Sequence, residues 1–326
     1  MFGIFQQPAM TISVVIPTFN SAAFIGEALD SVMSQTLPVA EIIVVDDGST
    51  DATEAIVAGY PQVKWTRQSH QGPSAARNCG IRQAQSAWIA FLDSDDLWHP
   101  EKLGKQLAAL RSFPSAGFSF STLVSFFDRD NVTVENEPYL PSELQRWLNG
   151  KTDREGRAFG NVYPLLLKTN CVLTSSLVAR RQALLEAGLF DETMRHGEDH
   201  DLWLRLARRW PAVFIIDRIA TYRIHSSAIS GQWEKRQELF YRSTVETLAK
   251  HRCMFPSYQA SKALAHMYNH FAMYQLKERA FGEAKSLAGL GLHAVPTLTG
   301  IRLWLEAAFP RAYSHAVGLL RGSRPS

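Results

Sequence analysis

The segment WIAFLDSDDLWHP, residues 88–100, carries three carboxylates within four positions, those of Asp93, Asp95 and Asp96. Its first half is an apolar run bounded by polar residues, which is typical of a strand buried on both faces. A helix is predicted to begin at Pro100, so capping of that helix does not explain the three aspartates upstream. Carboxylates this close repel one another unless a cation lies among them, and Mg²⁺ and Mn²⁺ prefer oxygen ligands. The segment therefore favours a metal or polar-ligand site over a solvated turn.

The surrounding pattern predicts the elements that position these acids. Apolar runs predict strands, and 3.6-residue periodicity predicts helices between them, giving strands at 11–17, 41–46, 63–69 and 88–92 and helices at 21–35 and 73–85. This alternation predicts an α/β fold with a mostly parallel central sheet and helices on both faces. Ligands bind at the carboxyl ends of the strands in such sheets, so we expect the acids at a nucleotide-binding edge.

Further motifs belong to the same edge. The first strand ends in VVIPTFN and the second in VVDDGSTD, GPSAARNCG opens a helix, and GEDHDLW follows about a hundred residues after DSDD. Phosphate-binding loops are excluded by spacing. The GKT at 150–152 has glutamine at 145 where the first glycine is required, and GLGLHA at 289–294 follows a predicted helix instead of a strand.

In this order the motifs resemble those of the family 2 inverting glycosyltransferases, which have a GT-A fold, over about residues 11–231. The resemblance implies a sugar-nucleotide donor whose nucleobase is held by Pro17, Phe19 and Asp47. Phe19 would lie against the face of the base, and Asp47 would recognise its ring edge. Arg77 would lie near the nucleotide, and Asp93 would bind the ribose.

The resemblance also implies the residues of the reaction itself. Asp95 would bind a divalent metal, Mn²⁺ or Mg²⁺, which His225 of YRIH would approach, and Asp199 of GEDHD would be the general base. This agrees with the chemistry, because a cation stabilises a diphosphate leaving group and a carboxylate can take the proton of the acceptor hydroxyl. A single in-line displacement inverts the configuration at the sugar carbon.

Several acids and histidines near these motifs also have structural explanations. Glu198 and Asp201 are expected to interact with the dipole at a helix N-terminus. A single histidine at a strand end, such as His225, is more often structural than a ligand. His196 and His200, which flank Asp199, are expected to be solvated.

The chain is expected to contain a GT-A domain over 11–231 and a C-terminal helical region over 232–326. Within the first, residues 128–161 lose periodicity and gain turn residues, which predicts a loop-rich insertion on the acceptor side that shapes a second pocket. One helical hairpin in the C-terminal region is similar to a tetratricopeptide unit, but one hairpin is not a repeat array.

Charge and hydropathy give expectations about location. Net charge is +3, yet residues 235–326 hold 13 Lys and Arg against 5 Asp and Glu. No apolar stretch reaches the roughly 18 residues that span a bilayer, no signal-type start is evident, and the 3 cysteines show no disulfide or zinc pattern. We therefore expect a cytoplasmic protein. The basic tail and its apolar stripe, which includes Ile301, Trp304 and Leu305, predict peripheral attachment to an anionic membrane surface.

The expected function is metal-dependent, inverting transfer of a sugar from a nucleoside-diphosphate donor, with a UDP-sugar as the expected donor. The expected acceptor is a saccharide or lipid-linked saccharide in surface polysaccharide synthesis. No nucleic-acid partner is expected. One alternative is a nucleotidyltransferase, but PTFNSAAFIG lacks the basic residues that grip a triphosphate. The other is a non-catalytic sugar-nucleotide or glycan-binding protein, against which Asp95 and Asp199 together argue.

Overall fold

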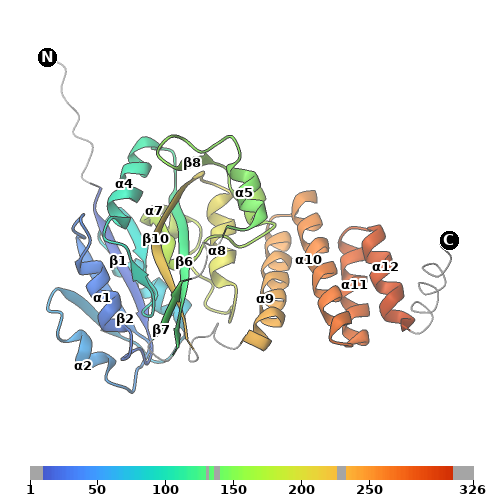
Figure 1. Cartoon of the computed structure of the whole chain (residues 1–326), viewed down its shortest axis with the longest axis horizontal. Helices are drawn as coiled ribbons and strands as arrows, with labels where there is room; N and C mark the ends of the chain where they lie inside the picture. The colour runs from blue at the N-terminus through green and yellow to red at the C-terminus, as the bar shows by residue number, and fades with distance from the viewer. Residues whose placement is uncertain (1–9, 130–131, 136–139, 226–232, 311–326) are drawn as a thin grey trace, which may run out of the picture. The chain divides into compact units, whose positions relative to one another are not determined.

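The structure is a computed structural model, and it describes residues 10–129, 132–135, 140–225 and 233–310. The chain divides into two compact units, Met1–Gly231 and Gln232–Ser326. In Figure 1 the first is coloured blue to yellow and the second orange to red. The first unit is α/β and the second helical, which confirms the predicted fold class with its C-terminal helices.

One sheet organises the first unit. Its strand order in the described residues is β3-β2-β1-β4-β9-β6-β10-β5, with β7 beside β6 and β8 beside β10. The bounds are β1 Ile12–Thr18, β2 Glu41–Asp46, β3 Val63–Arg67, β4 Trp88–Phe91, β5 Leu97–Trp98, β6 Phe118–Arg129, β7 Val132–Glu135, β8 Arg157–Gly160, β9 Val178–Arg180 and β10 Ala212–Ile224. Strands β3, β2, β1 and β4 are parallel, as are β6 and β10, and antiparallel β9 joins the two blocks. Strands β5, β7 and β8 add short antiparallel pairings, so most of the paired positions of the sheet are parallel.

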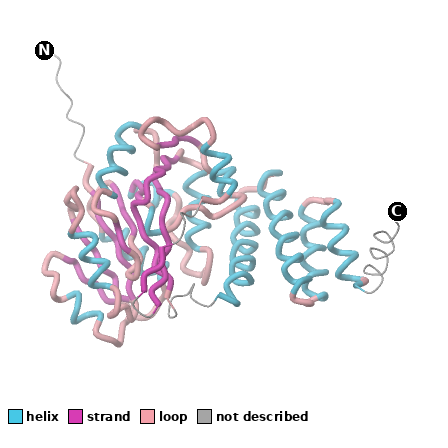
Figure 2. The backbone as a smooth tube through the Cα atoms, viewed as in Figure 1, coloured by secondary structure: helices cyan, strands magenta, loops and turns pink. Residues whose placement is uncertain are grey.

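Helices lie beside this sheet, as the cyan and magenta tube of Figure 2 shows. They are α1 Ile25–Met33, α2 Thr53–Val57, α3 Pro73–Gln83, α4 Lys102–Ser112, α5 Ser142–Leu148, α6 Tyr163–Leu166, α7 Arg181–Glu186 and α8 Glu198–Ala207. Every residue of β1, β2 and β4 is buried. Because side chains alternate between the faces of a strand, both faces must be covered. The carboxyl ends of these three strands meet at one edge.

Helix α3 lies unusually close to β1. A Cβ atom on Gly80 would lie 2.4 Å from Cγ1 of Val15, which is shorter than any normal contact. Only glycine therefore allows this approach, and the contact fixes the position of α3 over the sheet. Since Arg77 lies one turn earlier on the same helix, Gly80 also helps to set where that side chain points.

The second half of the unit differs from the sequence prediction in three places. The sequence AVFIIDRIATYRIH at 212–225 predicts two short strands, but β10 is continuous. Register shifts on either side of Arg218 mark an irregularity that breaks its alternating pattern. The apolar segment CVLTSSLVA at 171–179 predicts one strand, but the structure has only β9 there, preceded by the 3₁₀ helix η1 (Thr174–Ser176). The insertion at 128–161 is more regular than expected, because it contains α5 and β8.

The second unit consists, in its described part, of helices α9 Trp233–Met254, α10 Tyr258–Lys277, α11 Phe281–Ala294 and α12 Leu298–Ala308. Consecutive helices pack against each other around a small apolar core formed by Phe271, Ala272, Leu287, Ala288 and Leu303. Side-chain caps begin two of them, because Ser257 Oγ accepts the N–H of Ala260 and Thr297 Oγ1 accepts that of Gly300.

Candidate active site at the carboxyl edge of the sheet

The turn after β4 separates its three aspartates into different environments. Asp96 is buried and accepts hydrogen bonds from Ser175 Oγ at 2.5 Å and from the backbone N–H of Arg223 at 3.0 Å. Burial, together with the charges of Asp95 and Asp93, raises the pKa of Asp96 well above its ordinary value. Asp93 and Asp95 keep 27% and 29% of their side chains exposed. These two, and not Asp96, are available to a ligand.

Asp95 faces the histidine at the end of β10. Its Oδ2 lies 3.1 Å from Nε2 of His225, whose ring packs on Phe24 with centroids 4.3 Å apart. Burial and the neighbouring charge of Asp93 raise the pKa of Asp95, while the hydrogen bond from His225 opposes that shift. His225 therefore lies beside the predicted metal ligand Asp95, and its own approach to a metal stays a prediction.

Arg77 joins Asp93, in the turn after β4, to helix α8. Its Nη2 lies 2.8 Å from Oδ1 of Asp93, and its Nη1 lies 3.1 Å from Oε1 of Glu198. The guanidinium is buried, and burial alone would lower its pKa, but Asp93 and Glu198 outweigh burial and raise it. Glu198 therefore does more than the predicted interaction with the helix dipole, because it pairs with Arg77 across 121 positions of sequence.

Asp199 lies in the first turn of α8, where Gly197 adopts a left-handed conformation with φ of 77°. Its Oδ1 accepts the N–H of His200 at 2.6 Å, and its Oδ2 accepts Nδ2 of Asn170 at 3.2 Å. Burial raises the pKa of Asp199, although the His200 N–H, Arg77 and Asn170 work in the opposite direction. The result is a held carboxylate with a raised proton affinity, which suits a general base.

The structure contradicts the prediction that His200 is solvated. The side chain is buried, not solvated, and its Nε2 lies 2.7 Å from the carbonyl oxygen of Leu166 in α6. Burial lowers the pKa of this imidazole. The reason is the helical period, because each residue of α8 points about 100° away from the one before it, and this places the His200 side chain on the buried face of the helix.

The expected base-binding residues lie at the ends of β1 and β2. Pro17 is buried within β1, and Phe19 just beyond is 43% exposed, with its ring centroid 4.3 Å from that of His70. Asp47 is buried, and its carboxylate accepts the backbone N–H groups of Gln71 and Gly72, both at 2.8 Å. In this structure Asp47 therefore shapes the loop before α3, and its contact with a base stays a prediction.

Residues 13–178 match the family model described as glycosyl transferase family 2. The match covers just over half of the chain. The chain belongs to glycosyl transferase family 2. An uncharacterized glycosyltransferase of Rickettsia conorii is 33% identical over 202 residues, which are 61% of this chain but only 30% of that protein. TuaG of Bacillus subtilis, named for teichuronic acid biosynthesis, is 27% identical over 237 residues, covering 71% of this chain and 86% of TuaG.

Solved structures share the fold of this family 2 chain. S. aureus TarS, residues 1–349 in complex with UDP-GlcNAc, superposes with a TM-score of 0.66 at 21% identity, covering 93% of this chain and 88% of that one. The mannosyltransferase PcManGT from Pyrobaculum calidifontis, in complex with GDP-Man and Mn²⁺, gives 0.57 at 19% identity, covering 94% and 82%. The likeness to TarS supports the predicted GT-A type fold.

Few of the described side chains of this family 2 domain are placed to hold a divalent metal. Among the described residues, no three Asp, Glu, His or Cys side chains converge into a metal-binding group. Asp93 is paired with Arg77 and Asp96 with Ser175, which leaves Asp95 and His225. Mg²⁺ is commonly held by one or two protein carboxylates plus phosphate oxygens and water. The residues present therefore fit a cation that is also bound by a nucleotide diphosphate.

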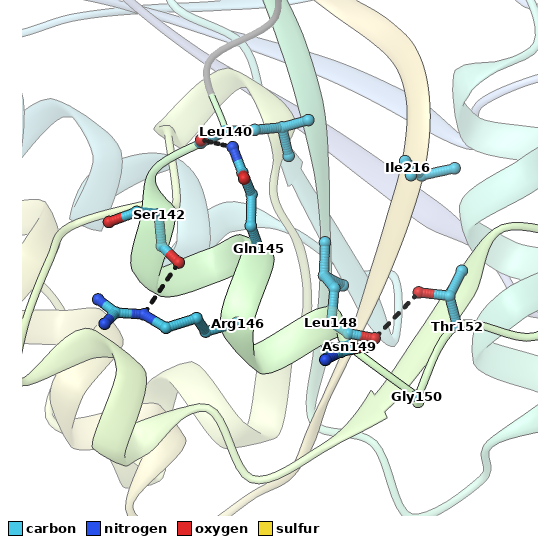
Figure 3. Close-up of a pocket in the computed structure, with 9 residues that line it drawn as sticks. All are labelled: Leu140, Ser142, Gln145, Arg146, Leu148, Asn149, Gly150, Thr152 and Ile216. Carbon is cyan, nitrogen blue, oxygen red and sulfur yellow. Dashed lines mark hydrogen bonds between the residues drawn. The ribbon is translucent and has the colours of Figure 1, made fainter.

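A separate hollow of about 720 Å³ lies on the insertion. Figure 3 shows helix α5 and the turn after it on one side and Ile216 of β10 on the other. The lining of this hollow includes none of Asp93, Asp95, Asp199 and His225. The hollow is therefore distinct from the cluster of acids at the carboxyl edge of the sheet.

Two residues of the site were missed by the sequence analysis. Asn170 fixes one oxygen of Asp199, and Arg223 contacts the backbone of Asp95 through Nε at 2.9 Å. Arg223 lies within the YRIH stretch that was singled out for its histidine, so its position in that motif was the available signal. Asn170 lies in an irregular segment and gave no signal.

Proposed function

We propose that this protein is a metal-dependent, inverting glycosyltransferase that moves a sugar from a UDP-sugar to a saccharide or lipid-linked saccharide acceptor in surface polysaccharide synthesis. One observation carries the proposal: Arg77 links Asp93, beside Asp95, to Glu198, beside Asp199. The proposed donor-binding carboxylate is thus connected through Arg77 to the residue that precedes the proposed base. TarS, which was crystallised with UDP and UDP-GlcNAc, supports the choice of UDP.

Each residue of the site would have a separate role in donor binding or in the transfer step. Phe19 and the Asp47 loop would hold the base, Asp93 the ribose, and Asp199 would take the proton of the acceptor hydroxyl as it attacks. Asp95 and His225 would hold Mn²⁺ or Mg²⁺, which when bound supplies charge stabilisation to the diphosphate leaving group. Attack from the face opposite the leaving group gives inversion.

The acceptor side of the proposal rests on relatives and on the insertion. TuaG is named for teichuronic acid biosynthesis, and an Escherichia coli protein named chondroitin synthase is 26% identical over 210 residues. Both names point to polysaccharides. We therefore assign residues 128–161 to the acceptor side, where the hollow is lined by apolar side chains such as Leu148 and Ile216 and by polar ones such as Gln145 and Asn149.

Binding of a panel of nucleotide sugars, with and without Mn²⁺, tests the proposal. We expect UDP-sugars to bind only with metal and to be hydrolysed slowly when no acceptor is present. A non-catalytic binding protein would bind without hydrolysis. A nucleotidyltransferase would prefer nucleoside triphosphates, and either result would overturn the proposed activity.

A peripheral membrane location is a second part of the proposal. No helix in the described part of the chain is long and apolar enough to span a bilayer. Helix α12 exposes Leu298, Ile301 and Leu305, while Trp304 is half-buried against the small core of its unit. The exposed apolar residues of α12, with the basic excess of residues 235–326, would contact an anionic surface.

Vesicle co-sedimentation checks this location. The full chain should bind anionic vesicles and be released in high salt, because Lys and Arg near the surface contribute about 1 kcal/mol each and are screened by salt. Ile301→Glu with Leu305→Glu should abolish binding, whereas Met33→Glu, at an equally exposed position on α1, should not. Equal sedimentation of both variants would exclude α12 as the membrane contact.

A further inference from the structure

A buried serine binds both ends of the aspartate turn, residues 93–96, that follows β4. Ser175 belongs to the 3₁₀ helix η1 and is 3% exposed. Its Oγ accepts the backbone N–H of Asp93 at 3.0 Å and donates to Oδ2 of Asp96 at 2.5 Å. The turn also has a hydrogen bond of its own, from the N–H of Asp96 to the carbonyl oxygen of Asp93 at 3.0 Å. One hydroxyl group therefore contacts the first and the last residue of the turn.

Ser175 is itself held by the core of the first unit. Its carbonyl oxygen accepts the indole N–H of Trp98 at 2.8 Å, and Trp98 is buried. The ring of Trp98 lies against Lys102 of α4, whose Nζ is 4.1 Å from the ring centre. Side chains that are locked in this way by packing and hydrogen bonds are the ones that can hold a neighbouring site in one geometry. The Ser175 hydroxyl is thus a fixed point for the turn.

We infer that Ser175 is a positioning residue for the divalent cation, because it sets the conformation of the turn from which Asp95 extends. The inference rests on the proposed function, in which Asp95 binds the cation. Asp95 lies between the two residues that Ser175 contacts, and the backbone dihedral angles of a turn decide where its central side chains point. Without the hydroxyl, the N–H of Asp93 and one oxygen of Asp96 lose a buried partner. The turn would adjust to satisfy them, and Asp95 would move with it.

Two further contacts hold the middle of the turn. Ser94 Oγ lies 2.7 Å from Oγ of Ser21, and the carbonyl oxygen of Asp95 accepts Nε of Arg223 at 2.9 Å. These contacts should keep the turn folded when the Ser175 hydroxyl is removed. We therefore expect the metal site to be loosened but not lost, with a metal affinity about 10-fold to 100-fold weaker, the scale seen when groups behind metal ligands are removed.

The same 3₁₀ helix contains a matched control. Ser176 is as deeply buried as Ser175, but its Oγ donates to the carbonyl oxygen of Leu173 at 2.8 Å, within its own segment of the chain. Replacing either serine with alanine leaves a buried polar group without its partner, so both variants should melt at a lower temperature than the wild type. A loss of metal affinity is expected in Ser175→Ala alone.

The experiment is a titration of the full chain with Mn²⁺ in the presence of UDP, below the melting transition, in which electron paramagnetic resonance reports free Mn²⁺. Ser175→Ala should weaken Mn²⁺ affinity about tenfold or more, and Ser176→Ala should bind as the wild type does. Ser175→Cys places a weaker donor at the same position, so its affinity should lie between those of the wild type and Ser175→Ala. If Ser175→Ala does not fold, the comparison of Ser175→Cys with Ser176→Ala decides the question.

The outcomes separate this inference from the proposed function. Wild-type Mn²⁺ affinity in folded Ser175 variants would overturn the role of Ser175 and leave the proposed metal dependence intact. Equal losses of affinity in the Ser175 variants and in Ser176→Ala would show a general effect of destabilisation and would also overturn it. A wild type that binds no Mn²⁺ with UDP would overturn the proposed metal dependence, and the inference with it.

Discussion

Replacing Asp199 with asparagine should lower sugar transfer by about 10²-fold or more while leaving donor affinity unchanged, the usual scale of general-base catalysis. The amide keeps the size of the carboxylate. Its oxygen can still accept the N–H of His200, and its NH₂ can bond to Asn170 once the Asn170 amide flips, so the fold of α8 should persist. It cannot accept the proton of the acceptor hydroxyl. Steady-state transfer rates and a separate donor titration measure the two effects.

The pH profile gives the same prediction a second readout. Burial raises the pKa of Asp199 above its ordinary value of 3.8, and the base acts in its charged form. Activity should therefore rise with pH through that raised pKa, and the acid limb should lie at higher pH than for an ordinary aspartate. In Asp199→Asn the residual rate should lose this limb.

A control and an alternative complete this test. Glu186→Gln, at an exposed acid of neighbouring α7, should retain wild-type rate and profile. Near-normal turnover in Asp199→Asn would move the base to Glu198, because Asp201 is fully buried and paired with Arg205 at 2.7 Å. Glu198→Gln alone should then remove the activity.

Strand periodicity predicted where the acids lie. Continuous apolar runs ended at Val45 and Leu92. Since the carboxyl ends of neighbouring parallel strands meet, the acids that follow, Asp47 and Asp93 among them, had to approach one edge of the sheet. The family resemblance added Asp199, which spacing alone did not distinguish from Glu198. Fold class and the position of these carboxylates at one edge of the sheet were therefore accessible from sequence, because both follow from short-range pattern.

Partners of these acids were not accessible in the same way. Whether Arg77 points to solvent or to Asp93 depends on how closely α3 approaches β1, which Gly80 decides. Its second partner, Glu198, lies within reach only because α8 packs on the rest of the unit, and the sequence does not show this packing. Backbone donors are equally invisible in a sequence, so the N–H groups that occupy Asp47 could not be predicted.

Replacing Asp95 with asparagine should abolish Mn²⁺-dependent donor binding without weakening the fold. The other acids of the turn have partners that leave Asp95 as the carboxylate facing His225. An amide removes the charge that holds a divalent cation but keeps an oxygen for the histidine. Since burial and Asp93 raise the pKa of Asp95, its charge is a cost to the folded state, and thermal melting of the variant should stay equal or rise.

Titration of UDP with and without Mn²⁺ measures this effect, and Asp217→Asn serves as the control because that carboxylate lies on β10 but is 42% exposed and paired with Lys105. The control should keep the full metal dependence of the wild type. Unchanged affinity of Asp95→Asn for UDP, both with and without Mn²⁺, would show that the metal is not bound by Asp95. In that case the Asp95–His225 contact would be a structural hydrogen bond, and the cation, if one is used, would have to displace Arg77 from Asp93, at the cost of leaving a buried guanidinium with Glu198 as its remaining partner.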